Sequence, residues 1–338
     1  MDKLRVGLIG LGFIGLLHGR IYAENPCVEL VAVADVNKEA AKKFAGEFNC
    51  KAYFDYNEML KRDDIDAVDI CVPEDFHLAT AVDAANAKKT IIIEKPIAKT
   101  YADAMKIKNA ADVNGVRLMV AHVLKFDPRY VQLKDAIKAD KLGTITTLAL
   151  KRTNSQGTPK RLKGKVSIFY YLGIHDIEWM LDYNSNTKPV RVYAQASEVA
   201  LKGLTKDAVF VTVSFDNGSI GNLELNWAFP ENGACGFMTS VEAVGTKGAA
   251  LLNVDNQGLA VFGDVSVEYP DALHWPVYND KIQGDLKEEL DHFVQATLNN
   301  KPYLVNTDNA ISAVAIAEAA MKSIETEEVV KLGAPFSK

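Results

Sequence analysis

The glycine-rich stretch near the start of the chain constrains the fold more than any other part of the sequence. Residues 4–9 form a short apolar run that predicts a buried strand, the motif Gly10-x-Gly12-x-x-Gly15 follows directly, and an amphipathic run continues to about residue 24. A strand, a glycine turn and a helix in this order form the fingerprint of a dinucleotide-binding fold. In that fold Gly10 allows the tight turn, Gly12 lets the backbone approach a pyrophosphate, and Gly15 lets the helix pack closely on the strand.

An acidic residue at the end of the next strand strengthens this interpretation. Residues 29–34 form a second apolar run, and Asp35 follows it, 20 positions after Gly15, where a carboxylate accepts the ribose hydroxyls. The first helical residues, Phe13 and Ile14, are expected to offer backbone N–H groups to the phosphates at the positive end of the helix dipole.

The same carboxylate bears on the choice of cofactor. Asp35 repels a 2′-phosphate, so NAD is favoured over NADP, although the side chain of Lys38 is long enough to reach such a phosphate. An ordinary glycine turn that binds no nucleotide remains the alternative interpretation of the motif.

Length and charge limit the remaining classes of protein. A chain of 338 residues is expected to form about two domains. The formal charge of −6 and the pI near 5.6 argue against nucleic acid or an anionic membrane as the main partner. The cysteines show no CxxC pair and no zinc-like spacing to histidine, so we expect reduced thiols, a cytoplasmic protein and no metal site: Cys27, Cys50, Cys71 and Cys235.

The start of the chain also imitates an export signal. The charged residues MDKLR precede the apolar stretch VGLIGLGFIGLL, but no small-x-small cleavage site follows. His18 and Arg20 interrupt any length that could span a membrane. We therefore expect neither export nor a membrane anchor.

The order of apolar runs predicts two domains of different class. Strands and helices alternate as far as residue 123, which predicts an α/β Rossmann domain with a doubly wound parallel sheet over residues 1–123. Residues 124–338 are expected to form an α+β domain with a mostly antiparallel, open-faced sheet, and a last helix at about 307–325 is a candidate to pack back on the first domain. The strand-like runs of this second part cover residues 145–152, 190–199, 208–215, 220–227, 239–244 and 249–254.

Polar residues follow two buried strands of the predicted parallel sheet, at the edge where ligands bind. Val72 and Pro73 end one strand, and His77 follows either as a neighbour of the cofactor or as an ordinary polar residue in a first helical turn. Glu94 and Lys95 end the strand TIII. A lysine beside a positively charged nicotinamide ring can hydrogen-bond and polarise a substrate oxygen, whereas a surface lysine is the plain alternative.

The chain resembles the Gfo/Idh/MocA oxidoreductase family over nearly its whole length. The motifs that carry the resemblance are Gly10-x-Gly12-x-x-Gly15 with His18, Asp35, Cys71-Val72-Pro73 with His77, Glu94-Lys95-Pro96, Phe126-Asp127-Pro128 with Tyr130, and Gly173-Ile174-His175. The resemblance implies an NAD-dependent dehydrogenase that moves hydride between nicotinamide and a secondary alcohol of a sugar, polyol or inositol. It also implies a homodimer or homotetramer formed through the second sheet, with Lys95 at the reacting oxygen and His175 as the catalytic histidine.

Two positions depart from the family pattern. Tyr171 stands where an aspartate is usual, four residues before His175, and a tyrosine is not a carboxylate base at pH 7. Lys125 stands where an arginine is common, and the forked hydrogen bonding of arginine is lost there. Both remain candidate substrate-binding residues.

The most basic stretch of this acidic chain precedes the motif that contains His175. Residues 158–165 hold four positive charges, Arg161 among them. Either this loop draws an anionic substrate, such as a sugar acid, towards the site, or it is merely solvated.

Two other functions fit the same motifs. An NAD-dependent glycosidase would share the fold and most of the site residues. A nucleotide-binding protein that has lost turnover would explain Tyr171 in place of the aspartate.

Overall fold

The chain forms two compact units in its structure, a computed structural model that describes residues 3–231, 238–254, 259–264, 267–333 and 336. The first unit comprises Met1–Asp127 with Leu273–Ile311, and the second comprises Pro128–Ala272 with Ser312–Lys338. The predicted division at residue 123 therefore differs from these units in one large respect, because Leu273–Ile311 belongs with the first unit.

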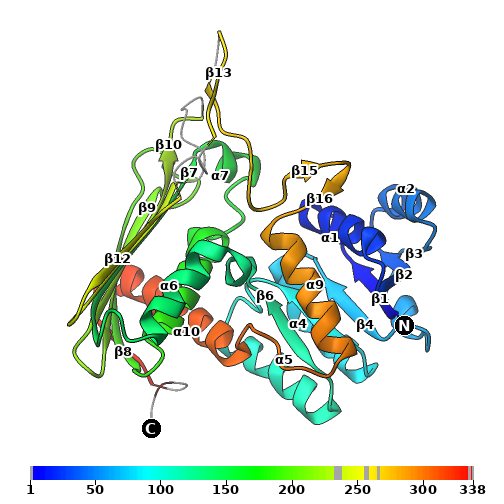
Figure 1. The fold of residues 1–338 in the computed structure, drawn as a ribbon, viewed down its shortest axis with the longest axis horizontal. Helices are drawn as coiled ribbons and strands as arrows, with labels where there is room; N and C mark the ends of the chain where they lie inside the picture. Colours follow the sequence, from blue (N-terminus) through cyan, green and yellow to red (C-terminus); the bar gives the residue numbers. More distant parts are fainter. Residues whose placement is uncertain (1–2, 232–237, 255–258, 265–266, 334–335, 337–338) are drawn as a thin grey trace. The chain divides into compact units, whose positions relative to one another are not determined.

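The first unit contains one sheet of six parallel strands in the order β3-β2-β1-β4-β5-β6, which confirms the predicted doubly wound architecture (Figure 1). Its strands are β1 Leu4–Ile9, β2 Val28–Ala34, β3 Lys51–Tyr53, β4 Ala67–Ile70, β5 Thr90–Glu94 and β6 Leu118–Ala121. Its helices are α1 Phe13–Glu24, α2 Lys38–Phe48, α3 Tyr56–Leu60, α4 His77–Asn86, α5 Tyr101–Asn114 and α9 Asp285–Leu298, with short 3₁₀ turns η1 Glu74–Phe76 and η2 Val123–Phe126.

The central strands of this sheet are buried on both faces. Every residue of β4 is buried, and the side chains of Ile91, Ile92 and Ile93 in β5 are fully enclosed. Continuous burial explains why residues 91–93 of β5 read as an uninterrupted apolar run, since helices cover both faces of a parallel sheet; in β4 the buried Asp69 interrupts the run. Helix α9 packs against α1, although more than 260 residues separate them in the sequence.

The second unit contains a seven-stranded sheet in the order β12-β11-β7-β10-β9-β8-β17. Its strands are β7 Ile145–Ser155, β8 Pro189–Ser197, β9 Ala208–Phe215, β10 Ile220–Phe229, β11 Met238–Gly245, β12 Ala249–Asn253 and β17 Val330–Lys331. All neighbours run antiparallel except β7 and β10, which pair in parallel with Thr147 opposite Ile220. The predicted, mostly antiparallel sheet is confirmed.

The remaining elements are helices and short hairpins. The helices are α6 Pro128–Lys138, α7 Gly157–Arg161, α8 Ile174–Tyr183 and α10 Thr307–Thr326, with a π-helical turn η3 at Phe169–Gly173. The hairpins, which the sequence patterns did not predict, pair β13 Val261–Phe262 with β14 Val267–Glu268 and β15 Val277–Tyr278 with β16 Lys281–Ile282. Among the described residues, no helix is both long and apolar enough to cross a membrane.

Burial alternates along the second sheet, so one face is covered and the other is open. Val211, Leu223 and Leu150 on one face are buried, whereas Phe210 on the opposite face is 59% exposed and Leu251 is 77% exposed. This alternation is typical of an antiparallel sheet with one face on the core, and it confirms the predicted open-faced sheet.

A buried ion pair fastens α8 to β7. Arg152 donates two hydrogen bonds to Asp176, at 2.6 Å and 2.9 Å, and a third to the hydroxyl of Tyr130 at 3.2 Å. Arg152 is 6% exposed and Asp176 is fully buried. Removal of either partner would leave a charge in the core with no compensation.

Asp176→Asn should lower the free energy of unfolding by about 3–5 kcal/mol, because it leaves the Arg152 guanidinium without its counter-charge. The measurement is urea denaturation followed by circular dichroism. The control is Lys151→Met, which removes a half-exposed pair with Glu224 on the same strand and should cost less than about 1 kcal/mol. Equal losses in the two variants would contradict this account of the buried pair.

Candidate active site

The glycine turn between β1 and α1 is built by close backbone contacts. Gly10 has φ +95°, and a Cβ there would lie 2.7 Å from the carbonyl oxygen of Cys71. A Cβ at Gly15 would lie 2.0 Å from the carbonyl oxygen of Gly10, so only glycine lets the helix approach the turn this closely. A Cβ at Gly12 would meet nothing within 4 Å, which leaves the backbone open to a ligand at that residue.

The N-terminus of α1 is suited to an anion. Gly12 is the N-cap and provides no side-chain cap, and the first turn of this 12-residue helix contains no acidic residue. The N–H groups of Phe13 and Ile14 therefore carry the positive end of the helix dipole without a competing carboxylate.

Asp35 is held in place beside this turn. It follows β2, and its two oxygens accept hydrogen bonds from the N–H groups of Leu11 and Asn37, both at 2.7 Å. These contacts join the carboxylate to the glycine turn itself. The open backbone at Gly12 and the fixed carboxylate of Asp35 together fit an adenosine dinucleotide.

His77 is enclosed rather than open to the solvent at this edge. It is 1% exposed, its Nδ1 lies 2.8 Å from the carbonyl oxygen of Pro96, and its Nε2 lies 2.9 Å from that of Val72. Burial lowers the pKa of His77, so the neutral ring donates to one of the two carbonyls. His77 thus joins the loop after β4, where Val72 is half-buried and Pro73 exposed, to the turn after β5.

The charges of two lysines act on a buried imidazole near the ends of β5 and β6. His122 is 2% exposed, and its pKa is lowered to about 3, first by burial and then by the positive charges of Lys125 and Lys95. The structure thus brings together two of the predicted site residues around a neutral ring. Sequence reasoning missed His122, although a histidine directly after the apolar run 118–121 was the available signal.

Carboxyl groups lie behind this cationic region. Glu94 accepts a hydrogen bond from the backbone N–H of Lys95 at 3.0 Å, and burial raises the pKa of Glu94 while the charges of His18 and Lys95 oppose that rise. Glu289 of α9 is fully buried, and its pKa is well above the usual value because of burial and the nearby carboxylates of Glu94, Asp285 and Asp69. Glu289 was not predicted, because nothing in the local sequence places α9 against α1, β1 and η2.

The second unit places Tyr171 and His175 in successive turns. Tyr171 lies in η3, half-buried, with its ring centroid 6.2 Å from that of Trp227, and His175 lies in the first turn of α8, also half-buried. Asp176 and Glu178, the two carboxylates that follow His175 in the sequence, are not exposed, so neither can replace the aspartate that is usual at position 171. Asp176 is engaged by Arg152, and Glu178 is 1% exposed.

The basic loop is partly neutralised. Arg161 ends the short helix α7 and is exposed, as are Lys163 and Lys165. Lys160 forms an ion pair with Glu231 at 2.5 Å. Within the part of the chain that the structure describes, Arg161, Lys163 and Lys165 form no ion pair, so three exposed cations remain along this part of the loop.

One group of metal-ligating side chains occurs among the described residues. The ligand atoms of His18, Asp69 and Cys71 lie within 4.8 Å of one another, and all three residues are buried. Hydrogen bonds among the three account for their arrangement, so we assign no metal to them. The expectation of a metal-free protein stays a prediction.

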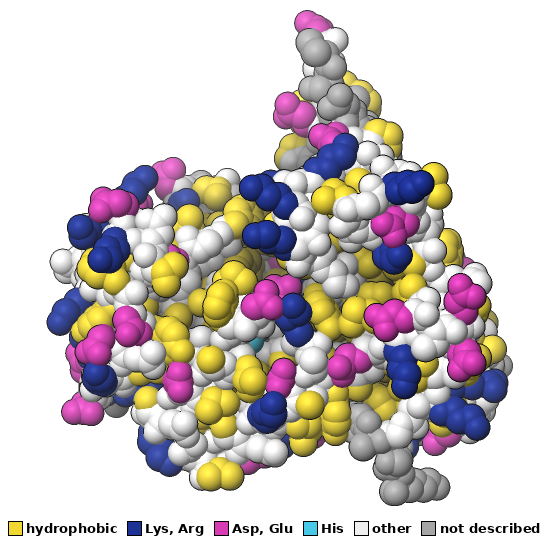
Figure 2. Space-filling model, turned by 180° about the vertical axis from the view of Figure 1, so that it is seen from behind, with side chains coloured by type: hydrophobic (Ala, Val, Ile, Leu, Met, Phe, Trp, Pro, Cys, Tyr) yellow, Lys and Arg dark blue, Asp and Glu magenta, His cyan; other side chains and the backbone are white. Residues whose placement is uncertain are grey.

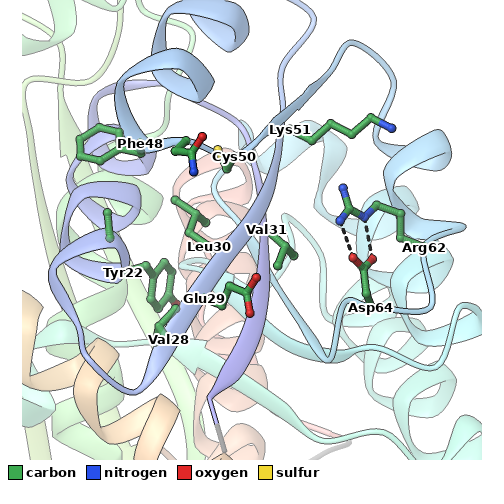
Figure 3. A pocket seen from close by; sticks show the side chains of 12 residues that line it. Tyr22, Val28, Glu29, Leu30, Val31, Phe48, Cys50, Lys51, Arg62 and Asp64 are labelled. Carbon is green, nitrogen blue, oxygen red and sulfur yellow. Dashed lines mark hydrogen bonds and ion pairs between the residues drawn. The ribbon is translucent and has the colours of Figure 1, made fainter.

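A pocket of about 620 Å³ opens elsewhere in the first unit (Figure 3). Leu30, Phe48 and Tyr22 line one part of it, and the ion pair of Arg62 with Asp64 lines another. None of the predicted site residues lines this pocket, so its volume says nothing about the glycine turn.

Glu289→Gln should flatten the pH dependence of stability. Above the ordinary glutamate pKa of 4.5 the unfolded chain releases a proton that the folded chain keeps on Glu289, so stability falls as pH rises from that value towards the raised pKa. The glutamine variant lacks this proton uptake, and its free energy of unfolding should decline less between about pH 5 and pH 8. Glu288→Gln, on the exposed side of the same helix, is the control. A slope equal to that of the wild type would show that Glu289 is ionised in the folded protein.

Known proteins resemble this chain in both sequence and fold. Rhizopine catabolism protein MocA of Rhizobium meliloti is 26% identical over 332 residues, which cover 97% of each chain. Inositol 2-dehydrogenase of the same organism is 26% identical over 339 residues, which cover 97% of this chain and 99% of the relative. The crystal structure of GenD2 from gentamicin A biosynthesis in complex with NAD superposes with a TM-score of 0.87 at 22% identity, covering 99% of this chain and 97% of that one.

Two family descriptions match almost the whole chain. Residues 4–122 match the description "oxidoreductase family, NAD-binding Rossmann fold", and residues 134–332 match "oxidoreductase family, C-terminal alpha/beta domain". These matches confirm the predicted enzyme class and the predicted cofactor, NAD. The chain belongs to the Gfo/Idh/MocA family of NAD-binding oxidoreductases.

Proposed function

We propose that the protein transfers hydride between NAD and a secondary alcohol of a sugar, a polyol such as inositol, or a related derivative. The observation that carries this proposal is the open glycine turn with the fixed carboxylate of Asp35, in a chain whose residues 4–122 match an NAD-binding oxidoreductase domain. Relatives named inositol 2-dehydrogenase support the class of substrate.

Some residues of the chain would bind the cofactor, and others would act on the reacting oxygen. When bound, NAD accepts or returns a hydride at C4 of its nicotinamide. The N–H groups of Phe13 and Ile14 would hold the pyrophosphate, and Asp35 the ribose. Lys95 would donate a hydrogen bond to the reacting oxygen and favour its negative charge.

His175 is the proposed partner in proton exchange. An imidazole titrates near neutral pH, so it can take the proton of the alcohol during oxidation and return it during reduction. Tyr171, one turn earlier, would hydrogen-bond substrate rather than act as a base. Lys125 would add a second point charge for a substrate oxygen.

A catalytically silent nucleotide-binding protein is the second candidate, and Tyr171 in place of the usual aspartate favours it. Tight binding of NADH with no turnover over a broad panel of polyols would support this candidate. Cleavage of glycosides with no net formation of NADH would instead indicate an NAD-dependent glycosidase.

We also propose a homodimer or homotetramer formed through the open face of the second sheet. That face carries exposed apolar side chains, Phe210, Ile220 and Leu251 among them. On the face shown in Figure 2, positive and negative side chains are interspersed, as expected for a protein with no nucleic-acid partner. The described cysteines, Cys27, Cys50 and Cys71, are free thiols, which supports a cytoplasmic location; Cys235 lies outside the described residues.

Lys95→Ala should lower kcat by about 10²–10⁴-fold, because the group that polarises the reacting oxygen is lost. The dissociation constant of NAD, measured by calorimetry, should stay within a few-fold of the wild type. Lys99→Ala, which removes an exposed lysine of the same loop, is the control and should keep wild-type kcat. Wild-type activity in Lys95→Ala would refute the assigned role.

Arg161→Ala tests whether the basic loop selects anionic substrates. If the loop attracts anions, kcat/KM should fall several-fold for sugar acids and little for neutral sugars, and the difference should shrink at high salt. Equal losses on both kinds of sugar would favour a merely solvated loop.

A further inference from the structure

His18 lies between two carboxylates in the core of the first unit. Its side chain is fully buried, with Nδ1 at 2.8 Å from Oδ2 of Asp69 in β4 and Nε2 at 3.6 Å from Oε1 of Glu94 in β5. It projects from α1, the helix that begins at the glycine turn. One ring therefore connects that helix to two neighbouring strands.

A ring in this position favours the doubly protonated form. A neutral imidazole carries one N–H, which Nδ1 can donate to Asp69. Nε2 makes no hydrogen bond to any described residue but lies 3.6 Å from Oε1 of Glu94, where a second N–H would carry a charge opposite to that of the carboxylate. Burial disfavours the charge, but the charge and hydrogen bond of Asp69 and the charge of Glu94 together raise the pKa of His18. The thiol of Cys71 donates a hydrogen bond to the other oxygen of Asp69 at 3.2 Å, so both oxygens of this carboxylate have a partner.

Glu94 lies near His18 with one carboxylate oxygen and binds the backbone of Lys95 with the other. Its Oε1 faces His18, and its Oε2 accepts the backbone N–H of Lys95 at 3.0 Å. Burial and the charge of Asp69 raise the pKa of Glu94, whereas the charges of His18 and Lys95 lower it, so an imidazolium at His18 favours the ionised Glu94 that accepts the N–H of Lys95.

We propose that His18 is a positioning residue: as an imidazolium bonded to Asp69 it fixes Glu94, and Glu94 fixes the backbone that carries Lys95. The consequence for catalysis rests on the proposed function, whereas the charge state of His18 does not. The titratable groups packed around this network come from four elements and are Tyr22 of α1, Asp69 and the adjoining Cys71 of β4, Glu94 of β5, and Asp285 and Glu289 of α9.

The charge state can be read without any assay of activity. Nitrogen-15 NMR of labelled protein, with the His18 signals assigned by their loss in His18→Asn, reports whether each ring nitrogen carries a proton. We expect both nitrogens protonated at pH 7 in the wild type and one of them deprotonated in Asp69→Asn, which keeps the shape but removes the charge. A neutral His18 in the wild type would overturn the proposal.

Two isosteres separate positioning from simple packing. Asn places its amide nitrogen near the position of Nδ1 and keeps the contact with Asp69, whereas Gln places its amide nitrogen near that of Nε2 and keeps the contact with Glu94. His18→Asn should therefore lower kcat on the order of 10²-fold with little change in KM, and His18→Gln should recover part of that loss. Tyr22→Phe removes a hydroxyl that acts on Asp69 rather than on Glu94, so it shows how much a change at the Asp69 end alone alters kcat.

The outcomes distinguish this inference from the proposed function. Wild-type kcat in His18→Asn, or equal kcat in the Asn and Gln variants, would contradict positioning through Glu94. If the wild type turns over no polyol or sugar, the proposed function fails, and the NMR result alone then decides whether His18 is the expected imidazolium.

Discussion

The close approach of Gly15 to the carbonyl of Gly10 is the contact on which the nucleotide-binding edge depends. It allows α1 to start directly at the end of β1, so that the free N–H groups of the helix point at the edge where the parallel strands end. Asp35 is tied to the same turn through the N–H of Leu11. Any side chain at position 15 would push the helix away from the turn and separate these groups.

The charge distribution at this edge of the sheet is set by the ionisable side chains buried next to it. Burial lowers the pKa of His122 to about 3, and the charges of Lys125 and Lys95 act in the same direction, while carboxyl groups of three elements interact with one another in the core. Several ionised carboxylates are costly to bury together, and accordingly the pKa values of Glu289 and His18 are both raised.

Local patterns predicted the elements well because each pattern reflects burial of one face. The alternation at Ala208–Phe215 and the apolar period of Asp285–Leu298 give the observed bounds of β9 and α9. Such patterns do not specify which elements pair. The sequence therefore did not reveal that β7 pairs in parallel with β10, or that α9 joins the first unit.

In the candidate site, too, local features could be predicted from the sequence and long-range contacts could not. The glycines, Asp35 and Lys95 could be located from motifs, because a motif records a local backbone requirement. His18 contacts Asp69, which is 51 positions further along the chain, and His77 contacts Pro96, which is 19 positions further along. No local sequence pattern encodes these contacts. The roles of Lys95 and His175 in catalysis stay predictions.

The most direct test of this account is a crystal structure of the protein with NAD bound. We expect the pyrophosphate to accept hydrogen bonds from the backbone at Phe13 and Ile14, and the nicotinamide to lie beside the ammonium group of Lys95. A complex in which that amine points away from the nicotinamide, or in which side chains fill the space beside Gly12, would contradict it.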